Sequence, residues 1–152
     1  MRVGNGLDYA AAPGSTVSIE VFAENYVDLR GYELVVQITG GTAGTLTLSN
    51  LYVDQAKTNF AFFGQPTTVG GNLADARAIA ALNTGGATST LPKYVATIQA
   101  VLSSDAAGTF TVALLPGGGD TGTLAGDSTR APMTVNITGE TKVVASVGFS
   151  MQ

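Results

Sequence analysis

Hydrophobic and polar residues alternate over several short stretches of this chain. Val17, Ile19 and Val21 are separated by polar residues, which is the period of two that a half-buried β-strand requires. The alternation returns over residues 32–38. Similar runs, most of them bounded by Gly, Pro, Asn or Asp, occupy residues 45–53, 93–102, 109–115, 133–138 and 142–151. About seven short strands without a linker predict one all-β domain over residues 1–152, a sandwich or a barrel.

The run over residues 93–102 differs from the others because both of its faces are fairly apolar. Tyr94 and Ala96 begin one face, which continues to Leu102, and Val95 and Thr97 begin the other. A strand that is apolar on both faces is typical of the centre of a sheet. We therefore expect a central strand here.

One segment breaks the period of two. Asn72 is followed three residues later by Asp75, as at a helix N-cap, and Leu73, Ala76 and Ala80 recur at helical spacing. The sequence after residue 82 returns to turn-forming residues. This pattern predicts a short inserted helix near residues 73–82.

Composition excludes several classes of function. The chain of 152 residues contains no Cys and no His, so zinc sites, thiol chemistry, haem ligation and histidine general bases are ruled out. The net charge is −4, and the seven Lys and Arg residues are scattered singly, so a nucleic-acid partner is not expected. There is no apolar run of about 20 residues that could span a membrane as a helix.

The order of turns and strands resembles that of cohesin-like modules. The resemblance begins with APGSTVSIEVF at residues 12–22 and VDLRGYEL at residues 27–34. It continues through residues 44–48, 93–98 and 105–114. It implies a jelly-roll sandwich of about nine strands, from the cohesin and carbohydrate-binding superfamily of bacterial extracellular proteins. In cohesins a sheet face binds dockerin domains, although no residue of this sequence can be matched individually to that surface.

Residues 139–152 lie outside this resemblance and read as an additional C-terminal strand. Its alternating apolar positions are Val143, Ala145, Val147, Phe149 and Met151. Such a strand must pair with another one. It either closes an edge of its own sheet or adds to the sheet of a neighbouring subunit, as in assemblies joined by strand donation.

Candidates for catalysis and metal binding are few. Several carboxylates lie close together in the sequence, but Glu20 and Glu33 occupy outward strand positions, where solvated surface charge is the ordinary role. We therefore predict that the protein is not an enzyme. The glycine-rich segment 117–127 could fold oxygen ligands around calcium, with carboxylates from Asp120 and Asp127. An inter-strand loop is the simpler interpretation of that segment, and no other cofactor is expected.

Sugar binding is a further possibility, because carbohydrate-binding modules stack sugar rings on aromatic side chains. The chain has no Trp. Tyrosines could substitute, and the phenylalanine cluster at residues 60–63 could form an apolar platform, although core packing also explains most of these residues. The tyrosines are Tyr9, Tyr26, Tyr32 and Tyr52.

Together these observations predict a non-catalytic, extracellular or cell-surface module for protein–protein interaction or structural assembly. Its expected partner is a dockerin-type domain or a copy of itself. A filament or surface-layer subunit joined by its terminal strand, and a carbohydrate-binding module, are the alternatives. The chain as given begins without an apolar segment, so a signal peptide is not part of it.

Overall fold

Thirteen β-strands make up the regular structure of the residues that the computed structural model describes. These residues are 1–6, 8–117, 122–130, 132, 133, 135, 137 and 140–145. They contain no helix, which confirms an all-β chain and corrects the expected number of about nine strands. The strands are β1 Arg2–Val3, β2 Tyr9–Ala11, β3 Thr16–Ala23, β4 Tyr26–Gly40, β5 Leu46–Tyr52, β6 Thr67–Asn72, β7 Arg77–Leu82, β8 Ala87–Ser89, β9 Lys93–Leu102, β10 Gly108–Leu114, β11 Leu124–Asp127, β12 Pro132–Met133 and β13 Thr141–Ala145.

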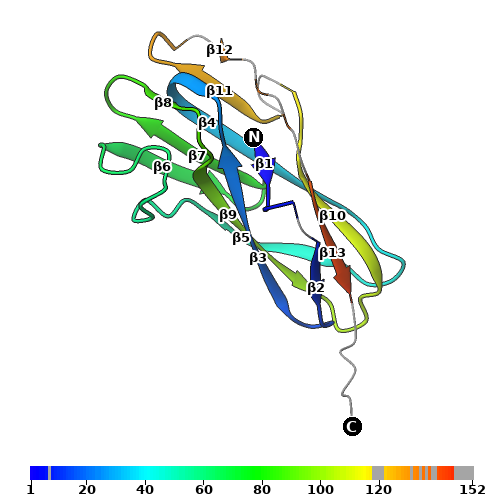
Figure 1. The fold of residues 1–152 in the computed structure, drawn as a ribbon. Helices are drawn as coiled ribbons and strands as arrows, with labels where there is room; N and C mark the ends of the chain where they lie inside the picture. Colours follow the sequence, from blue (N-terminus) through cyan, green and yellow to red (C-terminus); the bar gives the residue numbers. More distant parts are fainter. Residues whose placement is uncertain are drawn as a thin grey trace.

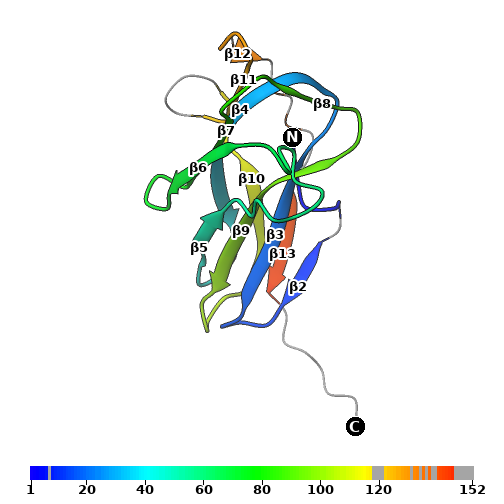
Figure 2. The same cartoon turned by 90° about the vertical axis from the view of Figure 1, so that its left-hand side faces the viewer.

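The strands form two sheets that pack as a sandwich (Figures 1 and 2). The smaller sheet has the order β1-β3-β9-β5. The larger sheet has nine strands, with a main path of β12-β11-β4-β10-β13-β2. Strands β7 and β8 pair with β4, and β6 pairs with β7. The described part of the chain holds no helix that is long and apolar enough to cross a membrane.

The core lies between the two sheets and is built from the alternating apolar positions. Val17, Ile19 and Val21 of β3 are buried, as their spacing predicts. Leu34 of β4 and Val112 of β10 face them from the larger sheet and have no exposed surface. Burying each such aliphatic side chain contributes roughly 1.5–3 kcal/mol. The period of two in the sequence is therefore the pattern that assembles this core.

A bulge in β9 corrects one feature of the predicted central strand. Val21 pairs with Ala96 and Phe22 pairs with Tyr94, so Val95 is an extra residue in β9. Tyr94 is thereby placed on the same face as Thr97, and the two side-chain oxygens lie 2.7 Å apart. The expectation that Tyr94 shares a face with Ala96 is wrong because the bulge reverses the alternation at that point.

The helix predicted near residues 73–82 is also wrong, because the segment is a β-hairpin of β6 and β7. Ala78, Ala80 and Leu82 are buried in alternation with Arg77 and other residues that are not, which is the period of a strand. The apparent N-cap belongs to the turn of this hairpin. The Asn72 side chain accepts a hydrogen bond from Ala74 N at 2.9 Å and donates one to Asp75 Oδ2 at 2.7 Å. Asn and Asp favour such turns for the same reason that they cap helices, since their side chains bond to the nearby backbone.

Replacing Tyr32 by Phe is expected to destabilise the fold by about 1–3 kcal/mol. The Tyr32 hydroxyl donates a 2.6 Å hydrogen bond to the carbonyl of Val95 at the bulge, so its loss leaves a buried acceptor unpaired. Urea denaturation measures the change. The control Tyr52→Phe, at an exposed position, should change the free energy of unfolding by less than about 0.5 kcal/mol.

The stability of Tyr32→Phe is also expected to depend less on alkaline pH than that of the wild type. Burial raises the pKa of Tyr32 well above its ordinary value. The resulting stability is complete below the pKa of the unfolded chain, about 10, and is lost as the pH rises beyond it. Tyr32→Phe should therefore lose less stability than the wild type between neutral and alkaline pH. An equal loss in both proteins would contradict this assignment.

Candidate functional site

The larger sheet presents an outer face across several neighbouring strands. We call the part over β6, β7, β4 and β11 the β7 face. Its residues alternate with buried neighbours and lie in register: Ile79 is opposite Glu33 and Gly70, and Glu33 is opposite Leu124. The β7 face comprises Gly70, Arg77, Ile79, Ala81, Gly31, Glu33, Leu124 and Gly126.

Small residues make the β7 face flat. Ala81 is opposite Gly31, and Gly31 is opposite Gly126, so one row across three strands carries no side chain larger than a methyl group. Added side-chain volume is not tolerated everywhere, since a Cβ on Gly31 would lie 3.3 Å from the Ala80 carbonyl oxygen. A flat, small-residue row allows a partner to approach the backbone closely.

The charges of the β7 face are arranged as a pair. The Arg77 guanidinium forms a salt bridge with the Glu33 carboxylate, and the two side chains are only 23% and 17% exposed. They lie diagonally across β7 and β4, next to Ile79, which is 39% exposed. Arginine is enriched at protein interfaces, and the exposed Ile79 adds apolar surface beside it.

The predicted calcium ligands are only partly described. Asp120 lies outside the described residues. Asp127 closes a turn after β11, where its Oδ1 accepts hydrogen bonds from Thr129 N at 2.8 Å and Thr129 Oγ1 at 2.6 Å. Among the described residues, no group of three or more Asp, Glu, His or Cys side chains could hold a metal ion. The calcium site stays a prediction.

The predicted interaction strand is described as far as Ala145. Val143 and Ala145 lie in β13, which pairs antiparallel with β10 and parallel with β2, and Val143 is fully buried. Both backbone edges of β13 are therefore used within the chain. Val147, Phe149 and Met151 lie outside the described residues, and a joining role for them stays a prediction.

The aromatic candidates for sugar binding divide into two groups. Tyr26 and Tyr32 are buried, as is most of the phenylalanine cluster, where the Phe62 ring centroid lies 5.6 Å from that of Tyr32. Tyr9 and Tyr52 instead line one cavity of about 350 Å³. The sequence could not separate these groups, because exposed and core tyrosines occupy the same strand-like patterns.

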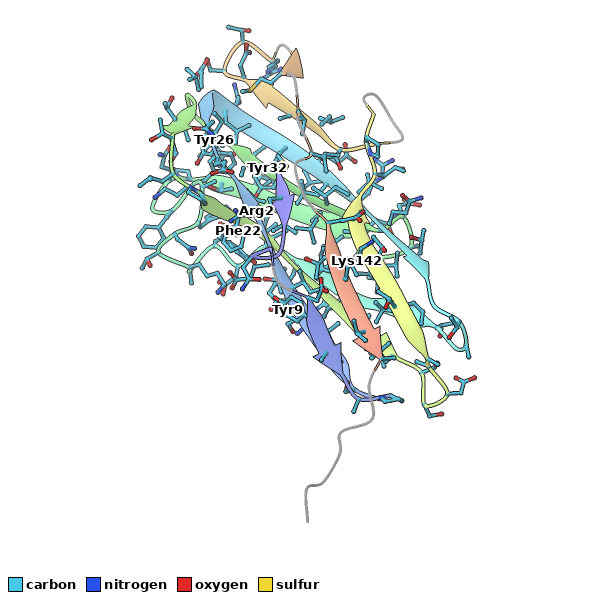
Figure 3. All side chains as sticks on the ribbon, turned by 45° about the vertical axis from the view of Figure 1, so that its right-hand side comes forward. Arg2, Tyr9, Phe22, Tyr26, Tyr32 and Lys142 are labelled. Carbon is cyan, nitrogen blue, oxygen red and sulfur yellow. The ribbon has the colours of Figure 1, made fainter. Side chains whose placement is uncertain are left out.

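A second cavity of about 410 Å³ lies where β1 and the start of β4 meet, and the sequence gives no sign of it. Arg2 and Phe22 line it, and the Arg2 guanidinium lies 5.6 Å from the centroid of the Phe22 ring (Figure 3). Arg2 Nε is buried and has no hydrogen-bond partner among the described residues. The pairing of β1 with β3 brings these two residues into register, which sequence spacing alone does not reveal.

Known structures share this architecture. A non-cellulosomal cohesin from the hyperthermophilic archaeon Archaeoglobus fulgidus matches with a TM-score of 0.61 at 12% sequence identity, over 95% of this chain and 89% of that one. A type II cohesin domain from the cellulosome of Acetivibrio cellulolyticus matches with a TM-score of 0.51 at 13% identity, over 90% of each chain. The type II cohesin dyad from the adaptor ScaA scaffoldin of the same organism gives 0.50 at 13% identity, over 98% of this chain and 48% of that one.

These similarities show that the chain has a cohesin-like fold, which confirms the resemblance seen in the sequence. No protein-family model matches the chain. No curated protein matches it either.

The calcium prediction can be checked on Asp127. If Asp120 and Asp127 hold calcium, millimolar calcium chloride should raise the melting temperature of the wild type and leave that of Asp127→Ala unchanged. Loss of the turn alone should lower the melting temperature of Asp127→Ala in both calcium and EDTA. Differential scanning fluorimetry measures both effects. A wild-type melting temperature that is the same in calcium and EDTA would exclude the site.

Proposed function

We propose that this chain, which has a cohesin-like fold, is a non-catalytic protein–protein interaction module that works outside the cell. The observation that carries the proposal is the β7 face, a flat sheet surface on which Arg77 and Glu33 neutralise each other beside the exposed Ile79. A partner can cover such a surface without burying an unpaired charge, which would cost several kcal/mol.

The two glutamates singled out from the sequence are engaged in ion pairs. Glu33 pairs with Arg77, and Glu20 Oε1 lies 2.7 Å from Lys57 Nζ. The two glutamates also lie on different sheets, on β4 and β3. A glycosidase needs two carboxyl groups on either side of one bond. The arrangement of these side chains therefore supports binding rather than catalysis.

The partner that we propose is a dockerin-type domain. Solved structures with a similar fold include a type II cohesin domain from a cellulosome and a type II cohesin dyad from an adaptor scaffoldin. The β7 face suits a folded partner because it crosses four neighbouring strands and includes a row of small residues. Ile79 would enter the partner's surface as the central apolar residue.

Ile79→Arg is the variant that tests this surface. A second arginine beside Arg77 would place an unpaired charge at the centre of the contact, so we expect dockerin affinity to fall at least about tenfold. Biolayer interferometry with the immobilised full chain and a panel of purified type I and type II dockerin modules measures the change. Ile79 is an outward residue, so its replacement should leave the fold intact, which circular dichroism verifies.

Thr47→Arg is the matched control. Thr47 is an exposed residue on β5, in the other sheet, and the same charge there should leave dockerin affinity unchanged. If no module of the panel binds the wild type, the dockerin partner is excluded. If Thr47→Arg abolishes binding and Ile79→Arg does not, the dockerin binds the smaller sheet, and the proposed surface on the larger sheet is incorrect.

Strand donation by the C-terminal segment predicts a different result. Light scattering of the purified chain would then show large assemblies that disappear when residues 146–152 are removed. Because β13 is already paired with β10 and β2, removal of these residues should leave the sandwich folded, and the assembly state alone should change. A monomer before and after removal would exclude donation by this segment.

A further inference from the structure

The outer face of the smaller sheet carries a cavity that a protein-binding role on the opposite sheet does not use. Glu20 of β3, Thr97 of β9 and Tyr52 of β5 are in register with one another across three neighbouring strands. These three residues line the cavity, whose volume is about 350 Å³. Two strand spacings, roughly 10 Å, separate Glu20 from Tyr52 along this row.

Aromatic side chains stand on both flanks of the cavity. Tyr52 is 38% exposed on β5, the edge strand of the smaller sheet. Tyr9, on β2, lines the other flank. Phe22 also lines the cavity and lies on β3, two residues after Glu20. Figure 3 shows Tyr9 and Phe22 along the same side of the molecule, on neighbouring segments. Aromatic residues from both sheets therefore line the cavity.

The surface between these rings is polar and electrically balanced. Glu20 Oε1 and Lys57 Nζ are 2.7 Å apart, and their side chains are 38% and 34% exposed, so both can still reach a ligand. The hydrogen bond to Glu20 and the charge of its carboxylate raise the pKa of Lys57 above its ordinary value. Ser18 Oγ accepts a hydrogen bond from Gln99 Nε2 at 3.2 Å, and its own hydrogen remains available to donate.

We propose that this cavity binds a neutral oligosaccharide. The carboxylate and ammonium of Glu20 and Lys57 form an adjacent acceptor and donor, which matches two neighbouring hydroxyl groups of a pyranose ring. The rings of Tyr9 and Tyr52 pack against the apolar C–H faces of the sugar, and their hydroxyls remain in water.

The neutral charge of the Glu20–Lys57 pair favours an uncharged ligand. A phosphorylated or sulfated ligand would need an excess of positive charge, and the single ammonium of Lys57 is already neutralised by Glu20. A purely apolar ligand would displace water from Glu20, Lys57 and the Ser18 hydroxyl without replacing the hydrogen bonds that this water makes. A polyhydroxylated ligand with apolar ring faces satisfies both groups, as expected for a pocket with aromatic walls and a few convergent polar atoms.

The proposal is independent of the protein partner, since the cavity lies on the outer face of the smaller sheet and shares no residue with the β7 face. One chain could therefore hold a folded partner on the larger sheet and a glycan on the smaller one. Loss of one activity would leave the other unchanged.

The test titrates the isotope-labelled full chain with cello-, xylo-, manno- and N-acetylglucosamine oligosaccharides and follows backbone amide shifts by NMR. We expect at least one series to give saturable shifts at Ser18, Glu20 and Thr97. Tyr52→Ala should weaken that binding at least about tenfold, because stacking on one aromatic ring is lost, whereas Tyr52→Phe should retain most of it.

Two control variants make the result specific. Phe63→Ala removes an aromatic side chain that is 49% exposed and does not line the cavity, so it should bind the sugar like the wild type. Ile79→Arg should also bind sugar normally while losing the dockerin. The proposal is overturned if all four sugar series leave the amide shifts unchanged. It also fails if shifts saturate outside the cavity, or if Tyr52→Ala binds as tightly as the wild type.

Discussion

The pairing of β4 on both of its edges is the constraint on which the larger sheet depends. This strand of 15 residues pairs with β8 and β7 along one edge and with β11 and β10 along the other. Its inward side chains Tyr32, Leu34 and Val36 enter the core, and the Tyr32 hydroxyl reaches the smaller sheet at the carbonyl of Val95. One strand therefore sets the register of four others and fixes the two sheets relative to each other.

That constraint also explains why the two outer surfaces differ. On the larger sheet, β4 and its neighbours present small residues and one internal ion pair, so the surface is flat. On the smaller sheet, the bulge at Val95 directs Tyr94 outward, where its ring contacts Phe60 and the Lys57 ammonium. Lys57 is thereby held near Glu20, and a cavity forms instead of a plane. A flat surface favours a folded partner, and a cavity favours a small one.

Sequence periodicity predicted the long strands well. The runs at residues 16–22, 32–38, 45–53 and 93–102 correspond to β3, β4, β5 and β9. A strand that is buried on one face needs an apolar residue at every second position, and this alternation is visible in the sequence. It failed at residues 73–82, where Asn72 forms a turn with bonds that also occur at helix caps, and alanines fit either period. The candidate surfaces were harder to foresee. Ile79 lies opposite Glu33 only because β7 pairs with β4, which is distant in the sequence. Tyr52 is likewise brought into line with Glu20 only because β5 and β3 both pair with β9.

The parallel pairing of β13 with β2 has a mechanical consequence (Figure 1). Tension applied between Tyr9, at the start of β2, and Ala145, at the end of β13, would pull the two strands past each other along their own axes. The hydrogen bonds of β13 to β2 and to β10 would then be loaded together, in shear, rather than broken one after another from one end. A module with this geometry resists extension along β2 and β13 far better than it resists peeling.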